Sequence, residues 1–589
     1  MTIKFGDFEL DEERREFALR GKLLAVQPKV FDLLVYLLRN AGRVVPKSEL
    51  LDRLWPNLHV TEGSLQRAVS LLRTALRKGG LDTALKSYSG RGYRLAIDQP
   101  DIRPFIDRQD QPGHDMSPHL REHAANRDWP AIVASLKDTP LEAVSIGDLA
   151  LWALAVECLG RSAEAIPLLQ QIVERSDSAE SRSMSVEAAA TLAKIHFERG
   201  QVAVSRGWLQ RALSSEDGSS PSTRAYLLWS QSRLRAFEGN PQEALDTAMQ
   251  ALAAAEAGGT MALRALTLAY VGFYNIALGN TRAGTEQQDH AAALAMSSSV
   301  DPITGGLIYC NILWSCRAAG DWSRALQWVG GFESWCDANY AGFSAACHLH
   351  RAEVAGTQGT LSEALARIGQ ALQYLPVSEP WATADAYRVR GDIQAAMGNL
   401  ANAQGDYKRA YELGWDAEPG HAVLLAQSGD IDGAIAALDR VLLATGWFGL
   451  QRRGMLLAHK ARINAMAGRC DEARACIALL QDYYETWPSA AVHALVQEAQ
   501  AMIAFHEKSQ SPTAAQAMSL ARQLWTSAGA EYDVARVRLA LARIMLATGD
   551  AAGAHVEAHC CVIAAEKIGA RRLLEEASAL LPAAGTAAA

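Results

Sequence analysis

The chain has 589 residues, 49% hydrophobic and 21% charged, which excludes intrinsic disorder and leaves about four ordinary domains or one long repeat array. No apolar stretch approaches the roughly 18 residues of a membrane helix, and the N-terminus lacks the apolar middle of a signal peptide. Nine cysteines without a CxxC pair exclude a disulfide framework. We therefore expect a cytoplasmic protein. The net charge of −8 is unevenly spread, because residues 1–98 hold 17 Lys and Arg against 12 Asp and Glu whereas the remainder holds 40 against 53, and this contrast predicts a nucleic-acid module joined to another kind of domain.

Short segments of alternating apolar residues open the chain. This pattern in residues 1–26 predicts a small antiparallel sheet. Pro28 suits the first position of a helix, and apolar residues at helical spacing continue to Leu38. Ala41-Gly42 ends this helix, and a second short helix is expected from Pro46. Sheet and helices together predict a small α+β domain.

A third helix is expected over residues 60–77, with Leu65, Val69, Leu72 and Leu76 as its buried stripe. Its opposite face carries polar and basic residues three to four positions apart, which share one side of the helix; these are Gln66, Arg67, Ser70, Arg73, Thr74 and Arg77. Such a face can enter a DNA major groove. The segment 86–95, with Gly90 and Gly92 at its turn, predicts a basic hairpin directly afterwards.

The run LWPNLHVTEGSLQRAVSLLRTAL (54–76) followed by YSGRGYRL (88–95) resembles the winged helix-turn-helix domain of the OmpR/PhoB family. The resemblance covers about 98 residues, including the leading sheet. It implies that helix 60–77 is the recognition helix and that hairpin 86–95 is the wing.

The same resemblance assigns roles to individual residues. Trp55 matches a position that touches the DNA backbone, Arg67 and Ser70 match groove-facing positions, and Arg73 matches a phosphate contact. The wing's minor-groove arginine falls on Ser89, with Arg91 two residues on as its substitute. The expected DNA-binding set is Trp55, Ser64, Arg67, Ser70, Arg73, Thr74, Arg77, Ser89 and Arg91. The loop Pro56, Asn57, Leu58 and His59 matches a segment that touches RNA polymerase in some members.

A proline-rich stretch, residues 99–119, predicts a semi-extended linker. From residue 120 to residue 582 the sequence repeats a helix, a glycine turn and a helix with a small packing residue. The turn glycines are Gly160, Gly200, Gly239, Gly279, Gly320, Gly359, Gly398, Gly429, Gly468 and Gly549, with spacings of 40, 39, 40, 41, 39, 39, 31, 39 and 81. A period near 40 predicts about eleven helix pairs stacked as a solenoid.

These repeats resemble tetratricopeptide repeats with longer helices. The expected fold class is therefore mainly α, with a small α+β winged-helix domain followed by an α-solenoid of tetratricopeptide-like helix pairs. The whole arrangement resembles one-component regulators of the HilA type, which join an OmpR/PhoB-type domain to such repeats.

Two clusters in the repeat region leave alternatives open. Tryptophans at 314, 322 and 328 lie in the densest aromatic stretch; they either fill the core between helices or line a groove for a ligand or partner. His555, His559 and Cys560 lie on neighbouring turns of one helix, next to Cys561. That cluster either holds a metal ion or is a buried cysteine with surface histidines.

The sequence contains no G-x4-GK[ST], G-x-S-x-G or HExxH motif, so we expect no enzyme and no cofactor. It opens directly on the sheet, so we expect no receiver domain ahead of it. The expected function is sequence-specific regulation of transcription, with activation favoured over repression. The expected partners are promoter DNA, RNA polymerase, an effector bound to the solenoid and a second copy of the chain. The alternative is an interaction scaffold whose winged domain docks proteins.

Overall fold

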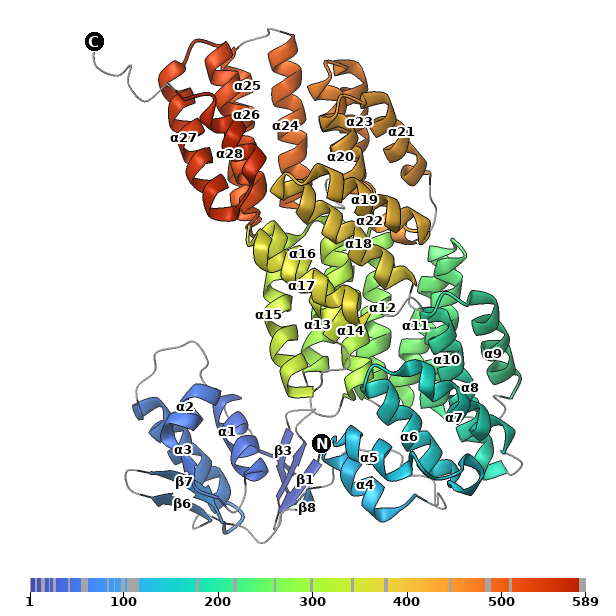
Figure 1. The fold of residues 1–589 in the computed structure, drawn as a ribbon. Helices are drawn as coiled ribbons and strands as arrows, with labels where there is room; N and C mark the ends of the chain where they lie inside the picture. Colours follow the sequence, from blue (N-terminus) through green and yellow to red (C-terminus); the bar gives the residue numbers. More distant parts are fainter. Residues whose placement is uncertain are drawn as a thin grey trace. The chain divides into compact units, whose positions relative to one another are not determined.

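The structure, a computed structural model, describes residues 2–5, 8–11, 16–20, 22–24, 28–40, 43–54, 62–81, 84–88, 91–96, 101–102, 116–175, 179–215, 220–258, 261–296, 300–339, 344–375, 380–443, 447–481, 489–507 and 511–581. The chain divides into two compact units, Met1–Asp110 and Gln111–Ala589 (Figure 1). Each unit has its own buried apolar core.

Unit 1 contains an antiparallel sheet in the order β4-β3-β2-β1-β8. Its strands are β1 (Thr2–Phe5), β2 (Phe8–Asp11), β3 (Glu16–Leu19), β4 (Lys22–Leu23) and β8 (Asp101–Ile102). Phe5, Phe8 and Phe17 stack on one another beneath it, with ring centroids 5.1–6.3 Å apart. The leading sheet is confirmed. Strand β8 is an addition, because two residues of the expected linker pair with β1.

Three helices and a second sheet, in the order β5-β7-β6, complete unit 1. Their bounds are α1 (Pro28–Arg39), β5 (Val45–Pro46), α2 (Lys47–Leu54), α3 (Glu62–Arg77), β6 (Leu85–Tyr88) and β7 (Gly92–Leu95). Pro28 is the first residue of its helix, as predicted. The second helix, however, begins at Lys47, because Pro46 lies in β5 opposite Gly92.

Unit 2 is a succession of helices (Figure 1). They are α4 (Pro118–Ala125), α5 (Trp129–Leu136), the 3-10 helix η1 (Leu141–Ala143), α6 (Ile146–Cys158), α7 (Ser162–Glu174), α8 (Ala179–Glu198), α9 (Val202–Ser214), α10 (Pro221–Phe237), α11 (Pro241–Gly258), α12 (Met261–Ala277), α13 (Thr281–Ala295), α14 (Pro302–Ala319), α15 (Trp322–Asn339), α16 (Ser344–Thr357), α17 (Leu361–Tyr374), α18 (Pro380–Met397), α19 (Leu400–Glu412), α20 (Gly420–Gln427), α21 (Ile431–Leu442), α22 (Trp447–Met466), α23 (Cys470–Gln481), α24 (Ala490–His506), α25 (Ser511–Ser527), α26 (Glu531–Ala547), α27 (Ala551–Ile568) and α28 (Arg571–Ser578). Among the described residues, eleven consecutive pairs run from α6–α7 to α26–α27.

Glycine ends the first helix of most pairs. All ten predicted turn glycines have φ between 70° and 93°, the left-handed region that glycine adopts without steric cost. At the first of these turns the N–H of Arg161 donates to the carbonyl of Val156 at 2.9 Å, which satisfies a helix-end acceptor. Five residues after each glycine a small residue is buried at the pair interface, as at Ala165, Ser205, Ala244, Gly284, Ala325, Ala364, Ala403, Ala434, Ala473 and Ala554.

The two irregular spacings have structural causes. The 31-residue interval ends in α20, which has only eight residues. The 81-residue interval arises because α24 ends without a left-handed glycine, its C-cap Glu507 having φ −79°.

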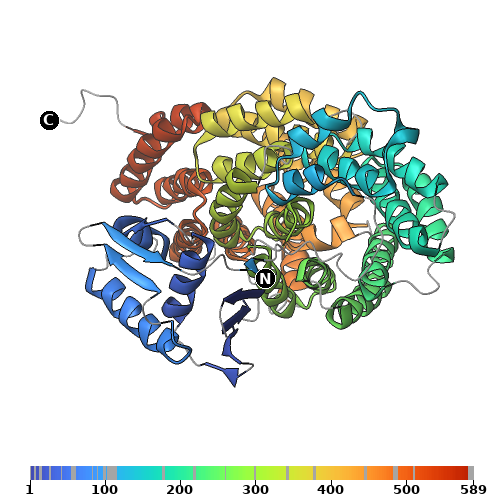
Figure 2. The same ribbon diagram turned by 90° about the horizontal axis from the view of Figure 1, so that it is seen from below.

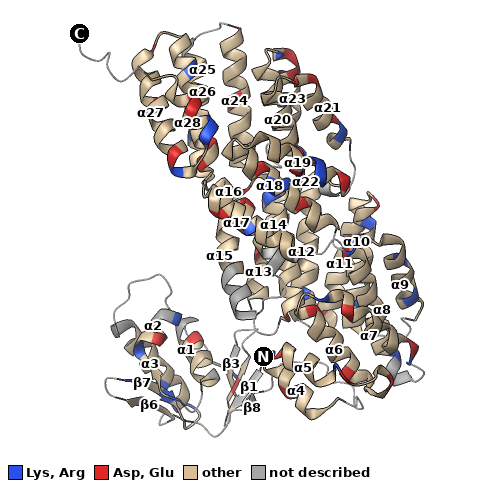
Figure 3. Cartoon of the chain, in the orientation of Figure 1, with Lys and Arg blue, Asp and Glu red and all other residues tan. Residues whose placement is uncertain are grey.

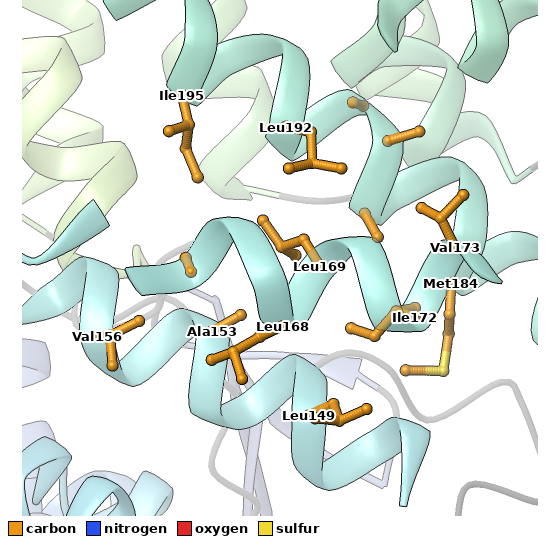
Figure 4. Close-up of a cluster of buried hydrophobic side chains, with 14 of the residues drawn as sticks. Leu149, Ala153, Val156, Leu168, Leu169, Ile172, Val173, Met184, Leu192 and Ile195 are labelled. Carbon is orange, nitrogen blue, oxygen red and sulfur yellow. The ribbon is translucent and has the colours of Figure 1, made fainter. Parts of the chain in front are cut away.

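Buried apolar clusters join neighbouring pairs. Figure 4 shows part of the cluster at the N-terminal end of unit 2, where side chains of α6, α7 and α8 meet. Leu149, Leu169 and Leu192, one from each helix, are at most 5% exposed. Because every helix packs on those before and after it, unit 2 is a helical-repeat solenoid.

The winding of unit 2 brings distant pairs into contact. Helix α22 lies against α12 and α14, and α26 lies against α16; Figure 2 shows helices at the centre of the array. Gln451 Nε2 donates to the carbonyl of Phe273 at 2.9 Å, and Ser489 Oγ donates to the carbonyl of Gly320 at 3.0 Å. The inner side of this solenoid is therefore not the long open groove that solenoids commonly present.

Candidate nucleic-acid interface

Helix α3 is amphipathic and packs against α1 and α2. Leu65, Val69, Leu72 and Leu76 are at most 2% exposed, which confirms the predicted buried stripe. Ala68 is also buried. Burying this stripe fixes which residues of the helix can face a partner.

The opposite face of α3 is polar and accessible. Gln66, Ser70, Thr74 and Arg77 are all exposed. The hydroxyl of Thr74 donates to the carbonyl of Ser70, one turn back, at 3.1 Å. The two hydroxyl side chains therefore lie on adjacent turns of one face, as the spacing predicted.

Arg73 joins the helix to the hairpin that follows it. Its Nη2 donates to the carbonyl of Leu85 at 2.9 Å and to Ser87 Oγ at 2.8 Å, and its Nε donates to the same carbonyl at 3.3 Å. These contacts hold β6 against α3. The sequence pattern gave no sign of this role, because residues 85 and 87 are a dozen or more positions away.

We predict that Arg73→Met, which keeps the stem but removes the guanidinium, destabilises unit 1 by about 1.5–3 kcal/mol, the range for hydrogen bonds from a charged group. Thermal unfolding of residues 1–110 measures this loss. Lys78→Met, directly after α3 and exposed, is the matched control and should change stability by less than about 0.5 kcal/mol. Equal losses in both variants would contradict the linking role of Arg73.

The hairpin β6–β7 pairs Leu85 with Leu95 and Tyr88 with Gly92. The N–H of Arg91 donates to the carbonyl of Tyr88 at 3.0 Å across its turn. Lys86, Ser87 and Arg91 are exposed, and basic segments are visible in the hairpin in Figure 3.

Gly92 lets β7 approach β5 closely. A Cβ at this position would lie 1.9 Å from the carbonyl oxygen of Val45, so no larger residue fits without moving the backbone. Gly92, which was predicted at the turn of the hairpin, thus allows the close contact between β7 and β5.

A second polar cluster pairs Arg43 with a carboxylate of the same unit. Arg43 Nη1 donates to Glu49 at 3.1 Å, and the hydroxyl of Tyr36 donates to the same carboxylate at 2.6 Å. The hydrogen bonds from Arg43 and Tyr36 lower the pKa of Glu49 to about 2. Arg43 is consequently already paired with a carboxylate that stays charged near neutral pH.

The structure does not describe several of the residues expected to contact DNA or RNA polymerase. Trp55, the loop Pro56, Asn57, Leu58 and His59, and Ser89 are not among the described residues. Ser64 and Arg67 belong to α3, but their side chains are not described. Their roles remain predictions from the sequence.

Unit 1 is similar to a known family of domains. Residues 21–95 match the family model described as "Transcriptional regulatory protein, C terminal". This match spans α1, α2, α3 and the hairpin. Unit 1 carries an OmpR/PhoB-type domain.

Relatives with this OmpR/PhoB-type domain include the phosphate regulon regulatory protein PhoB of Rhizobium meliloti, 33% identical over 94 residues, which are 16% of this chain and 41% of PhoB. The transcriptional regulator HilA of Salmonella typhi is 37% identical over 92 residues, 15% of this chain and 16% of HilA. The solved DNA-binding domain of E. coli CadC is 25% identical, with 16% of this chain and 92% of that domain covered and a TM-score of 0.16. The match thus spans less than half of the length of PhoB and HilA.

The OmpR/PhoB-type domain is followed by the second candidate site, the tryptophans of the solenoid. Trp314 and Trp322 both line a cavity in unit 2. Trp328 does not: its Nε1 donates to Asp289 Oδ1 at 2.8 Å and its ring packs beside Tyr309. The structure therefore separates the three residues expected to share one groove.

The histidine–cysteine cluster lies on α27. Cys561 is buried, and its Sγ donates to the carbonyl of Ala535 at 3.2 Å; burial raises its pKa to about 11. His559 is exposed and Cys560 half-buried. Within the part of the chain that the structure describes, no three His, Cys, Asp or Glu residues are grouped to hold a metal ion, so this cluster, with His555, shows no built site.

Across the described helices, none is long and apolar enough to span a membrane.

Proposed function

We propose that the chain is a sequence-specific DNA-binding transcriptional regulator whose helical-repeat body receives a signal, brings copies together, or does both. The observation that carries this is the exposed polar face of α3, held beside a basic hairpin by Arg73. A helix presented in this way fits a major groove, where side chains reach base edges.

In this proposal the two parts of the interface have different tasks. Arg67 and Ser70 face the bases from α3, with Ser64 and Thr74 beside them. The DNA phosphates are held by Trp55, by Arg77 and by Nη1 of Arg73, since Nε and Nη2 of Arg73 bond the hairpin. Arg91 and Ser89 place the wing at the neighbouring minor groove. Phosphate contacts release counterions, so affinity should fall steeply as salt rises.

One winged module contacts few base pairs, so we propose that two copies bind repeated half-sites. The loop 56–59 is the proposed contact with RNA polymerase, which makes activation the favoured outcome. The alternative, a protein-interaction scaffold, requires the polar face of α3 to dock a protein instead.

The charge difference between the parts suggests how the body acts. Residues 1–98 carry a net charge of +5 and the remainder −13, so the body can compete with DNA for the basic module. A signal that binds the body would then release the module.

Removal of residues 111–589 tests both the function and this coupling. Residues 1–110 have their own core, so they can be studied alone. Against a promoter fragment selected by the full chain, we expect the isolated module to bind more tightly per copy.

Two other results are informative. Weaker binding by the isolated module would show that the body joins copies on DNA and would contradict competition. No binding by either protein, at low salt and with a folded module, would contradict the regulator and favour the scaffold.

A further inference from the structure

A cavity of about 250 Å³ lies inside unit 2, where its turns meet. Its wall is formed by residues of helices α14, α15, α16, α18, α19, α20, α22, α25 and α26. Part of that wall is aromatic, with Trp314, Trp322, Trp525, Tyr407 and Tyr532. Such a volume suits one ring with a short substituent, and aromatic walls favour a flat apolar body.

One group of charges around the cavity is internally paired. Arg317 Nη2 donates to Asp385 Oδ2 at 2.7 Å, and Arg388 donates to the same carboxylate at 2.7 Å and to Asp392 Oδ2 at 2.8 Å. Glu353 bridges both arginines.

A second group is paired in the same way. Glu498 accepts from Arg462 Nε at 2.8 Å and from Arg536 Nη2 at 2.8 Å. Both arginines line the cavity, but their guanidinium groups already have a carboxylate.

Arg452 is the exception among the arginines of the wall. It is 8% exposed, and among the described residues its Nη2 has no hydrogen-bond partner and its guanidinium no ion pair. Burial and the nearby Arg388 lower its pKa, and the carboxylates of Asp385, Asp416 and Glu418, none within ion-pair distance, offset this only in part. An arginine buried without a counterion is costly, and an anion placed against it removes that cost.

Two other polar atoms of the wall are also unpartnered among the described residues. They are Oε2 of Glu418, which is 0% exposed, and Nδ1 of His459. Oε1 of Glu418, in contrast, accepts from Tyr411 and Arg440. An N–H donor on the ligand can satisfy Glu418, and also His459 in the tautomer whose Nδ1 carries no proton.

We propose that this cavity binds a small aromatic carboxylic acid, with its carboxylate on Arg452 and its ring among the tryptophans. The inference rests on the proposed function in one respect, since it names the signal that the body would receive. A ring that carries an N–H, such as an indole, also supplies a donor for Glu418 or His459.

The occupant is a small acid rather than a peptide for two reasons. The cavity volume is near the lower end for ligand sites. The only unpaired cation among the described residues of its wall is the single guanidinium of Arg452, which matches one carboxylate.

Calorimetric titration of the full chain with indole-3-acetate and with its neutral amide, indole-3-acetamide, tests the proposal. We expect the acid to bind at least about tenfold more tightly, because only the acid can form a charge-assisted pair with Arg452. Arg452→Gln should abolish this difference. Arg282→Gln, on the exposed and already paired Arg282, is the control and should preserve it.

Equal binding of the acid and the amide to the unaltered chain would overturn the proposal, as would no binding of the acid at about 1 mM. The first comparison needs no variant, so it holds even if Arg452→Gln fails to fold. DNA binding measured on the same preparation separates the two proposals: a chain that binds DNA but no acid contradicts only this inference, and a chain that binds acid but no DNA contradicts only the proposed function.

Discussion

Glu498→Gln should lower the free energy of unfolding of the repeat body by about 3–5 kcal/mol, the cost of removing one partner from a buried ion network. Glu498 is 2% exposed. Its Oε1 accepts from Trp525 Nε1 at 2.8 Å and from Arg536, and its Oε2 accepts from Arg462. Glutamine keeps the shape but removes the carboxylate paired with Arg462 and leaves Arg536 with Asp533 alone. Denaturant unfolding of the full chain measures the loss.

Glu286→Gln is the matched control. Glu286 also pairs with an arginine, but its side chain is 68% exposed, so the change should stay within about 0.5 kcal/mol. Similar losses in the two variants would show that the buried network does not stabilise the body.

The same network makes the free energy of unfolding of the repeat body depend on pH in the acid range. The arginines lower the pKa of Glu498 to about 2 from its ordinary 4.5, so its contribution is complete above pH 4.5 and is lost as the pH falls towards 2. His459, beside Arg462 and Arg536, has its pKa lowered by burial to about 3. It remains neutral when folded, so stability already declines below pH 6.5 as the unfolded chain takes up that proton. Glu498→Gln should remove the first part of this pH dependence and leave the second.

Arg67→Ala should weaken binding to a selected promoter site by about 1–3 kcal/mol and relax the preference at one base position. The reason is its expected place on the groove-facing side of α3, next to the exposed Ser70. Competition binding against duplexes with each base substituted in turn measures both effects.

Arg43→Ala is the control within the same module. Arg43 is paired with Glu49 and lies off α3, so its loss should leave the base preference unchanged. If Arg67→Ala leaves affinity and preference as they were, the assignment of Arg67 to base contact is wrong.

The features that the sequence predicted are those with local causes. Positive φ at Gly160 or Gly320 follows from the glycine itself, and the buried stripe of α3 follows from helical spacing. The same holds for Pro28 at the start of α1. Local chemistry and the repeat period were sufficient for the solenoid, whereas the domain type came from the resemblance to the OmpR/PhoB family.

Features that depend on distant residues could not be predicted. The contact of Gln451 with Phe273 joins residues 178 positions apart, and it depends on how far each pair rotates relative to the previous one. The cavity lining around Arg452, which has no ion pair among the described residues, follows from that winding. Strand β8 has the same origin, since two residues among prolines carry no strand signal until β1 is beside them.

Selection of fragmented genomic DNA by the full chain, with sequencing of the retained fragments at moderate salt, tests most directly whether the chain regulates transcription. The account predicts that a few promoter fragments are enriched and that they share a repeated half-site. The α3 variant Arg67→Ala should reduce this enrichment and relax the half-site at one base position, and the control Arg43→Ala should leave both unchanged. Retention of all fragments to the same extent, or of none by either the full chain or residues 1–110, would contradict the account.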